Sequence, residues 1–380
     1  MRFHVVSLPH TQTTKAYSHC AYTEKVRKFC DMMMARGHEV FLYAGEENEA
    51  NCTDHIVCIT KNEQRELIGV EGPADNLKAE FDPNAIYWQL MNAKAARAIK
   101  ENAKPQDFVC LIAGRCQQQI ATALPDLMSV EFGIGYGGTF SPYRVFESYA
   151  WMHMVYGAQS RDPHTADGNA FDAVIPNYYD PEEFPYSEEK EDYFLYMGRL
   201  TARKGYEIAS DVCERLGERL LVAGQGDAPK YGEYLGLVGP EQRGELLSKA
   251  KAVFVPTQYV EPFGGIAAEA MLCGTPIITT DWGAFVEYNV SGVTGYRCRT
   301  LADFMHAVQN VDRLKPQRIH NIAKGKFSMK VVGQQYESYF ERLLTLWEDG
   351  WYTLPVGEKK NGSNNDPGRN PRIRSNPARG

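Results

Sequence analysis

One stretch decides the fold of this chain: Tyr259-Val-Glu261-Pro-Phe-Gly-Gly265-Ile-Ala-Ala-Glu269-Ala-Met-Leu-Cys-Gly-Thr-Pro276. The apolar run 252–255 before it predicts a buried strand that ends at a proline, and the run 277–280 after it predicts the next strand. The segment between them predicts a loop followed by an apolar helix. Such a strand–loop–helix–strand unit is typical of open parallel α/β sheets, which bind ligands at the carboxyl ends of their strands.

Two glycines and two acids give this loop its chemistry. Gly264 and Gly265 let the backbone approach a ligand closely. Their amides and that of Ile266 lie at a helix N-terminus, where unpaired N–H groups and the helix dipole favour a phosphate. Glu261 and Glu269 flank this site with seven residues between them, and carboxylates accept hydrogen bonds from paired sugar hydroxyls. A helix with acidic capping residues is the alternative interpretation.

The spacing of Glu261 and Glu269 resembles the E-x7-E signature of retaining glycosyltransferases of family 4, which have the GT-B fold. The resemblance is dense from residue 193 to residue 295 and looser before it. It implies that Glu269 holds the nucleotide ribose and that Glu261, a candidate catalytic residue, lies near the donor sugar. It also implies that amides between the two acids hold phosphate and sugar hydroxyls. The residues concerned are Phe263, Gly264, Gly265 and Ile266.

A second motif, Gly198-Arg199-Leu-Thr-Ala-Arg-Lys204-Gly205, follows the apolar run 193–197. It resembles the G-R-L-x-x-x-K-G motif of the same family, which implies that Arg199 and Lys204 clamp the donor diphosphate. Arginine offers a forked pair of donors and lysine a point charge, and both suit phosphate oxygens. Gly198 and Val238, the latter in a turn that resembles the one beside the nucleotide base, are further candidate donor-binding residues. The alternative for the basic motif is a solvated turn.

Composition excludes several classes of protein. The chain has 380 residues, enough for two domains, and its net charge of -7 gives no general attraction to nucleic acid or anionic membrane. Its nine cysteines contain no C-x-x-C pair, which argues against a disulfide framework or a structural zinc site and for a cytoplasmic location. No apolar run approaches the roughly 18 residues of a spanning helix, so we expect no integral membrane association.

The predicted architecture is α/β, with two Rossmann-like domains that face a central cleft, as the GT-B resemblance implies. Residues 1–178 form the acceptor-side domain and residues 179–192 a linker. Residues 193–333 form the nucleotide-sugar-binding domain. Residues 334–350 are expected to form a helix that packs back on the first domain. Within the first domain, residues 144–156 predict an aromatic helix.

The C-terminal stretch 358–380 is poor in apolar residues and rich in Asn, Gly, Pro and Arg, so we expect a disordered basic tail. Such a tail can add weak, salt-sensitive affinity for nucleic acid. A merely solubilising end is the more common role.

Acceptor-side residues are harder to select, because the resemblance thins in the first half. His10 and Lys15 follow the first predicted strand, where many family members carry a glycine pair. Family members also often place a histidine after a later strand, and the corresponding position here is Glu131. Glu131 is therefore a candidate for acceptor binding, with a structural carboxylate as the alternative. The glycine cluster 133–138 lacks the helix that a dinucleotide fingerprint needs, so we interpret it as a loop.

The resemblance implies a retaining glycosyltransferase of the hexosyltransferase type, which moves a sugar from a UDP- or GDP-sugar to an acceptor hydroxyl. The absence of a D-x-D motif indicates a metal-independent reaction without cofactors. A glycan, a lipid-linked sugar and a modified nucleobase all remain candidate acceptors, and the sequence leaves the oligomeric state open. Alternatives are an epimerase or a phosphorylase on the same fold, or a non-catalytic binder of nucleotide sugars or nucleic acid.

Overall fold

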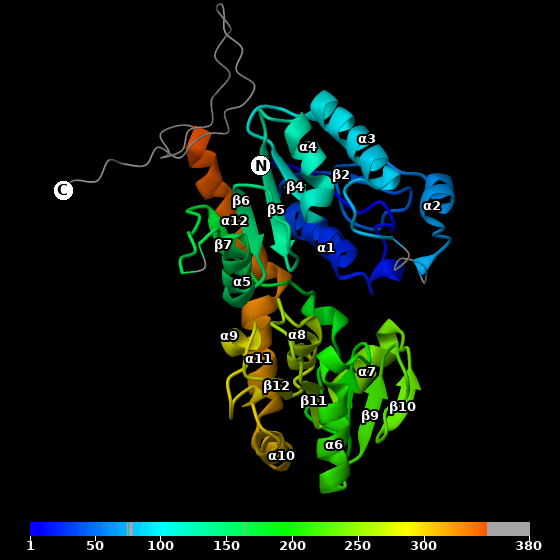
Figure 1. The fold of residues 1–380 in the computed structure, drawn as a ribbon, viewed down its shortest axis with the longest axis vertical. Helices are drawn as coiled ribbons and strands as arrows, with labels where there is room; N and C mark the ends of the chain where they lie inside the picture. The colour runs from blue at the N-terminus through cyan, green and yellow to red at the C-terminus, as the bar shows by residue number, and fades with distance from the viewer. Residues whose placement is uncertain (74, 76–78, 163, 348–380) are drawn as a thin grey trace, which may run out of the picture.

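The computed structural model describes residues 1–73, 75, 79–162 and 164–347. They form two parallel sheets with packed helices, one above the other in Figure 1. The strand order is β3-β2-β1-β4-β5-β6-β7 in the first sheet and β10-β9-β8-β11-β12-β13 in the second. All pairs of neighbouring strands are parallel. The prediction of an α/β chain with two Rossmann-like domains is confirmed.

The first domain alternates strands and helices along the chain. Its elements are β1 (Arg2–Val6), η1 (Lys15–Tyr17), α1 (Ala21–Ala35), β2 (Glu39–Ala44), β3 (Asp54–Val57), α2 (Lys61–Ile68), α3 (Ile86–Asn102), β4 (Phe108–Leu111), η3 (Gly114–Gln117), α4 (Gln118–Ala123), β5 (Met128–Ile134), β6 (Tyr143–Phe146), α5 (Tyr149–Gln159) and β7 (Asp172–Val174).

The second domain repeats this pattern after a short connection. Its elements, with those of the connection and the C-terminal helix, are η4 (Pro181–Glu183), β8 (Phe194–Met197), η5 (Ala202–Lys204), α6 (Tyr206–Leu216), β9 (Leu220–Ala223), β10 (Glu233–Gly236), α7 (Pro240–Lys249), β11 (Ala252–Val255), α8 (Gly265–Leu272), β12 (Ile277–Thr280), α9 (Phe285–Tyr288), β13 (Gly295–Cys298), α10 (Leu301–Asn310), η6 (Val311–Arg313), α11 (Pro316–Phe327), α12 (Met329–Leu344) and η7 (Thr345–Trp347).

The central strands form because each is a short apolar run that helices cover on both faces. All residues of β4 (Phe-Val-Cys-Leu) and of β11 (Ala-Val-Phe-Val) are buried, as expected for interior strands of parallel sheets. Polar loops follow the carboxyl ends of these strands, and loops of the two domains meet there. Ser148, which follows β6, donates a hydrogen bond of 2.6 Å to the carbonyl of Pro262, which follows β11.

The chain crosses between the domains twice, and the two crossings lie side by side. The amide of Tyr179 donates to the carbonyl of Phe327, and the amide of Met329 donates to the carbonyl of Tyr179, both at 2.9 Å. Helix α12 then runs along the first domain (orange in Figure 1), with Tyr336 and Phe340 buried in the same core as the first sheet. The second domain is therefore joined to the first by two adjacent segments of the chain.

The structure corrects two predicted elements. Residues 144–156 are not one helix, because β6 takes the first of them and α5 begins after Ser148, which caps it by accepting a hydrogen bond from the amide of Trp151. The C-terminal helix predicted for residues 334–350 begins earlier, at Met329, and ends at Leu344 as α12. The predicted tail 358–380 and residues 348–350 of the predicted C-terminal helix lie outside the described residues. Among the helices that the structure does describe, none has the length and apolarity needed to cross a membrane.

Candidate active site

The loop after β11 turns sharply at the carboxyl end of a central strand. Gly264 has a φ of 80°, and a Cβ there would lie 2.6 Å from Cε1 of Phe285, so no other residue fits without a shift. Helix α8 begins at the next residue, Gly265. The first amides of a helix have no intrahelical partner, so those of Gly265 and Ile266 are free to bind an anion in the field of the helix dipole.

Lys204 and Glu261 form an ion pair at this loop, with Nζ 2.8 Å from Oε2. Gly205 brings the two together, since at its φ of 71° a Cβ would lie only 2.1 Å from the carbonyl oxygen of Pro256. The hydroxyl of Tyr259 donates to the other carboxylate oxygen at 3.3 Å. Burial alone would lower the pKa of Lys204, but the Glu261 carboxylate outweighs it and the pKa is raised. Lys204 is therefore a cation at neutral pH.

Glu269 has a partner that the sequence analysis missed. Arg243 on α7 forms an ion pair with Oε2 of Glu269 on α8. This carboxylate is the main cause that raises the pKa of Arg243. The Nε of Arg243 is buried, and within the part of the chain that the structure describes it has no hydrogen-bond partner. No sequence motif joins the two residues, because only the packing of α7 against α8 brings them together.

These groups converge on a pocket of about 240 Å³ in the second domain. Its lining residues are Tyr196, Met197, Gly198, Lys204, Arg243, Phe254, Val255, Thr257, Glu261, Gly264, Gly265 and Ile266. Two cations, one carboxylate and the free amides of a helix N-terminus therefore face one small space. Six of the predicted donor-site residues are among its lining: Gly198, Lys204, Glu261, Gly264, Gly265 and Ile266.

Four predicted donor-site residues do not line this pocket. Arg199 is exposed at the end of β8, and its guanidinium has no ion pair or hydrogen bond within the described residues. Phe263 is only 3% exposed and packs its ring in the core, 5.5 Å from that of Phe327, so its side chain is not available to a ligand. Its carbonyl accepts a hydrogen bond of 2.6 Å from the hydroxyl of Tyr288. Val238 is half-buried against the core before α7. Glu269 does not line the pocket itself, but it forms an ion pair with Arg243, which does.

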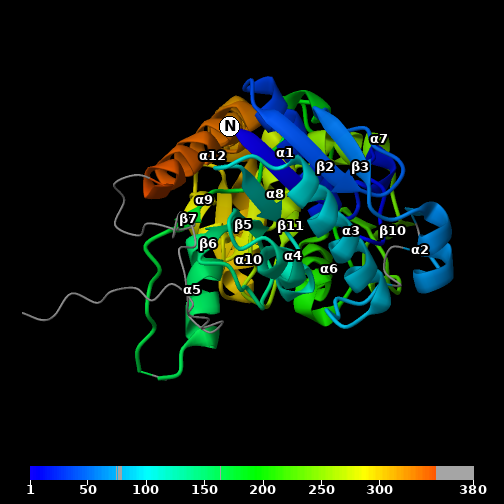
Figure 2. The same ribbon diagram turned by 90° about the horizontal axis from the view of Figure 1, so that it is seen from above.

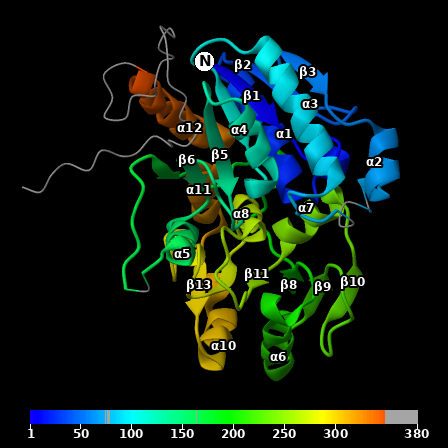
Figure 3. The same cartoon turned by 45° about the horizontal axis from the view of Figure 1, so that its top comes forward.

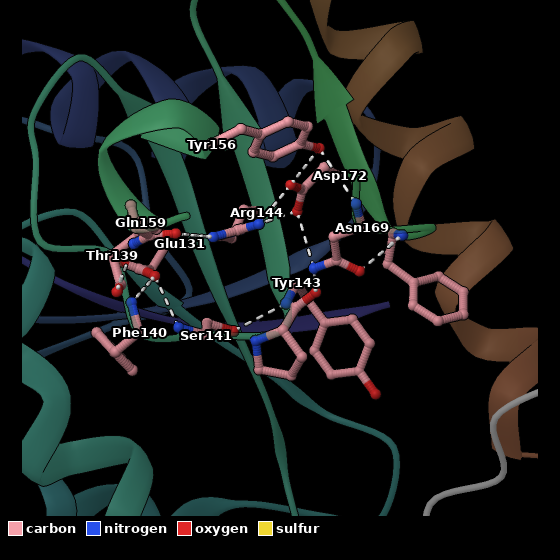
Figure 4. A network of polar contacts seen from close by, with 12 residues as sticks. Glu131, Thr139, Phe140, Ser141, Tyr143, Arg144, Tyr156, Gln159, Asn169 and Asp172 are labelled. Atoms are coloured by element: carbon pink, nitrogen blue, oxygen red, sulfur yellow. Dashed lines mark hydrogen bonds and ion pairs between the residues drawn. The ribbon is translucent and has the colours of Figure 1, made fainter. Parts of the chain in front are cut away.

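Glu131 on β5 is fully buried, which rules out contact with an acceptor in this structure. Figure 4 shows its carboxylate beside the loop that follows β5. Oε2 accepts hydrogen bonds from the amides of Phe140 and Ser141, both at 2.8 Å, and Oε1 accepts one from the hydroxyl of Tyr136. Burial raises the pKa of Glu131 to about 7. Glu131 is therefore a structural carboxylate, which is the alternative interpretation of the sequence. It holds the loop after β5 in place.

The other two acceptor-side candidates differ in environment. Lys15 is exposed on η1. His10 is 3% exposed, with its ring 5.7 Å from that of Phe81 and 6.3 Å from that of Trp88. Its Nδ1 is buried and has no partner among the described residues. A neutral imidazole with a free nitrogen is suited to accept a hydrogen bond from a hydroxyl group.

Burial lowers the pKa of His10 from its ordinary value of 6.5 to about 4, which predicts a pH effect on stability. Between pH 4 and pH 6.5, the imidazole of His10 is protonated in the unfolded chain and neutral in the folded chain. Stability is therefore fully present above pH 6.5 and falls as the pH drops towards 4, by on the order of 3 kcal/mol. His10→Leu should remove this part of the pH dependence in urea unfolding experiments. An identical slope in both proteins would show that His10 titrates normally.

A second buried ion pair lies at the carboxyl edge of the first sheet and was also missed. Lys25 on α1 pairs with Glu147, the residue before Ser148, and donates to the carbonyl of Gly133 at 3.1 Å. Burial lowers the pKa of Lys25 to about 7. The pair joins residues far apart in the sequence, so no local pattern predicts it. It fixes the start of α5, whose capping residue Ser148 contacts the loop after β11.

Comparison with known proteins agrees with this geometry. Residues 182–321 match the family model described as glycosyl transferases group 1. Over this C-terminal region, which is less than half of the chain, the sequence is similar to the group 1 glycosyltransferases. The matched segment contains both motifs that line the pocket, whereas the first domain lies outside it.

Two named relatives resemble the chain over part of their length. The chain is 33% identical over 129 residues to an uncharacterized glycosyltransferase of Methanocaldococcus jannaschii, a match that covers 29% of this chain and 33% of that protein. It is 32% identical over 162 residues to glycogen synthase of Mycobacterium tuberculosis, which covers 36% of this chain and 39% of that protein. The matches thus span well under half of these relatives.

The fold likeness extends over nearly the whole chain. The crystal structure of AviGT4, a glycosyltransferase involved in avilamycin A biosynthesis, superposes with a TM-score of 0.65 at 20% identity, and covers 90% of this chain and 98% of that chain. The chain therefore has the GT-B fold, as the sequence resemblance implied.

Proposed function

We propose that the chain is a retaining glycosyltransferase that transfers a sugar from a UDP- or GDP-sugar to an acceptor hydroxyl without a metal ion. The observation that carries this proposal is the convergence of Lys204, Arg243, Glu261 and the amides at Gly264–Ile266 on one pocket. Cations and free amides suit a diphosphate, and a carboxylate suits the sugar hydroxyls. The match of residues 182–321 to the glycosyl transferases group 1 model supports sugar transfer.

In this proposal, the pocket stabilises the charge that develops on the departing diphosphate. Lys204 and the amides of Gly265 and Ile266 donate to its oxygens, an electrostatic term that is usually the largest in catalysis. Arg199 supplies a second cation from the end of β8. Since Lys204 is paired with Glu261 in the structure described here, the incoming phosphate exchanges with this carboxylate. The exchange frees Glu261 to accept hydrogen bonds from the donor sugar.

The two carboxylates then orient the two ends of the donor. Glu269, fixed by Arg243, accepts from the ribose hydroxyls, and Glu261 accepts from the sugar. We do not assign them as the nucleophile and acid of a retaining glycosidase. The family resemblance implies front-side attack by the acceptor hydroxyl instead, with the leaving phosphate taking the proton. The acceptor itself is bound by the first domain, where His10 and Lys15 remain candidates.

A thermal-shift screen of UDP- and GDP-sugars tests the proposed donor class. A ligand that binds only the folded protein raises its stability by RT ln(1 + [L]/Kd), about 2.7 kcal/mol at 100 times Kd. The correct donor should therefore raise the Tm by several degrees, and inorganic phosphate at the same concentration should not. A chain that no sugar nucleotide stabilises would not be an enzyme of this class.

Turnover should be insensitive to metal chelation, because the proposed site neutralises the diphosphate with side-chain cations and amides. Transfer of radiolabelled sugar in the presence of excess EDTA should match the rate without it. A rate that falls on chelation and returns with a divalent ion would contradict the metal-independent mechanism.

A further inference from the structure

A groove of about 750 Å³ lies on the first domain, at the open edge of its sheet, and shares no lining residue with the donor pocket. Three elements form it: α5, the edge strand β7 and α12, which Figures 1 and 2 show close together. Figure 3 shows α12 beside β6, the neighbour of β7 in the sheet. Its lining residues are Tyr149, Met152, Tyr156, Asn169, Asp172, Ala173, Val174, Ile175, Val331, Gln334, Gln335, Ser338, Tyr339 and Arg342.

The α12 wall of the groove is a row of exposed polar side chains. Gln334, Gln335, Ser338 and Arg342 are exposed and follow helical spacing, so they lie on one face of the helix. In the described part of the chain, none of their side chains has a hydrogen bond or ion pair. The two amides and the hydroxyl each both donate and accept hydrogen bonds. This wall therefore offers neutral, bifunctional groups and a single cation.

The β7 wall offers backbone groups. β7 ends the sheet order, so within residues 1–347 as far as the structure describes them its outer side has no neighbouring strand. The amide of Ile175 donates to the carbonyl of Phe146 on β6, at 3.0 Å. Because the bonding direction alternates along a strand, the amide and carbonyl of Val174 point away from β6, towards the groove.

The third wall is α5, and the hydrogen-bond network in Figure 4 holds it against the sheet. Arg144 donates to both oxygens of Asp172, at 2.9 and 2.6 Å, and the hydroxyl of Tyr156 donates to the same carboxylate at 2.7 Å. Asn169 adds a further bond at 3.1 Å. These bonds neutralise Asp172 and fix the ring of Tyr156 at the groove. Tyr149, 56% exposed, presents a second ring at the start of α5.

We propose that this groove binds a carbohydrate chain. Sugar hydroxyls both donate and accept, as the free groups of Gln334, Gln335 and Ser338 do. Aromatic rings supply rigid apolar surface for the carbon-bound hydrogens of a sugar ring. A volume of about 750 Å³ is that of a ligand site for a short oligosaccharide. A peptide added to the sheet edge would find only the three residues of β7 to pair with.

The groove is connected to the donor loop through the first turn of α5. Ser148, the cap of α5, donates to the carbonyl of Pro262 between the two acids of the donor motif. The carboxylate of Glu287 on α9 accepts hydrogen bonds from the amides of Tyr149 and Ala150, at 3.1 and 2.9 Å. Tyr149 thus belongs both to the groove and to the contact between the domains. On the proposed function, a chain bound in the groove is the acceptor, with its growing end directed towards the donor pocket.

A glycan array followed by calorimetry tests this proposal on the full-length chain. We expect the protein to retain one class of oligosaccharide, and Gln334→Ala/Gln335→Ala to weaken its affinity at least tenfold. Tyr149→Ala should weaken it as well. Glu341→Gln, an exposed change on α12 outside the groove, is the matched control and should bind normally.

The measurement needs neither donor nor turnover, so it is independent of the proposed transfer. The Lys204→Ala protein should retain the same glycans as the unaltered protein, even though transfer is lost. The groove proposal is overturned if no glycan on the array is retained. It is also overturned if the paired glutamine variant binds as well as the unaltered protein, or if extended peptides displace the glycan as its stronger ligands.

Discussion

Replacing Lys204 by alanine should lower turnover by roughly 10²-fold or more, because the variant loses a cation aimed at the charge that develops on the leaving diphosphate. The effect should appear in kcat as well as in kcat/KM, since the interaction is stronger in the transition state than in the ground state. Initial rates of sugar release from the donor identified by thermal shift provide the measurement.

A matched control separates this effect from a general loss of charge or of fold. Arg215→Ala removes an exposed cation of the same domain, on α6, whose only ion pair within the described residues is with Asp211. It should leave turnover unchanged. Arg199→Ala should behave like Lys204→Ala, because the Arg199 guanidinium lies near the same strand end and has no partner among the residues that the structure describes. Near-normal rates for both Arg199→Ala and Lys204→Ala would remove these cations from the site.

Glu269→Ala should weaken the binding of the nucleoside diphosphate by roughly 10- to 100-fold, the value of a hydrogen bond to a charged group. Inorganic pyrophosphate lacks the ribose, so its affinity should not fall. It should rise, because Arg243 then loses the carboxylate that now neutralises it. Isothermal titration calorimetry with both ligands measures the difference.

The comparison of the two ligands is what identifies the ribose contact. Glu269→Gln keeps the size of the side chain and one acceptor oxygen, so it should weaken nucleotide binding less than Glu269→Ala. If both ligands lose affinity equally, Glu269 acts by holding Arg243 rather than by holding the ribose. An unchanged affinity for the nucleotide would contradict the assignment altogether.

The sequence predicted the turn and the helix start after β11 because the signals for them are local. Gly264 and Gly265 between two acids, after a strand ended by proline, specify a turn, a helix start and its free amides within a few residues. The placement of Lys204 was predictable from the second motif for the same reason. The strand and helix pattern of both domains also follows from short apolar runs between turns.

What the sequence did not predict depends on packing between distant segments. Arg243 meets Glu269 only because α7 lies against α8, and Lys25 meets Glu147 only across the carboxyl edge of the first sheet. Glu131 is an acidic residue near the end of a strand, which suggests a place in a cleft. Its strand is buried, however, and backbone amides donate hydrogen bonds to its carboxylate. Apolar aromatic residues suit strands and helices alike, which is why β6 was predicted as part of a helix.

A crystal structure with an intact sugar nucleotide, or with UDP or GDP and the sugar, tests the central claim most directly. The account predicts diphosphate oxygens within about 3.2 Å of Nζ of Lys204 and of the amides of Gly265 and Ile266, with the ribose hydroxyls on Glu269. A diphosphate bound elsewhere, with Lys204 still paired to Glu261, would contradict it.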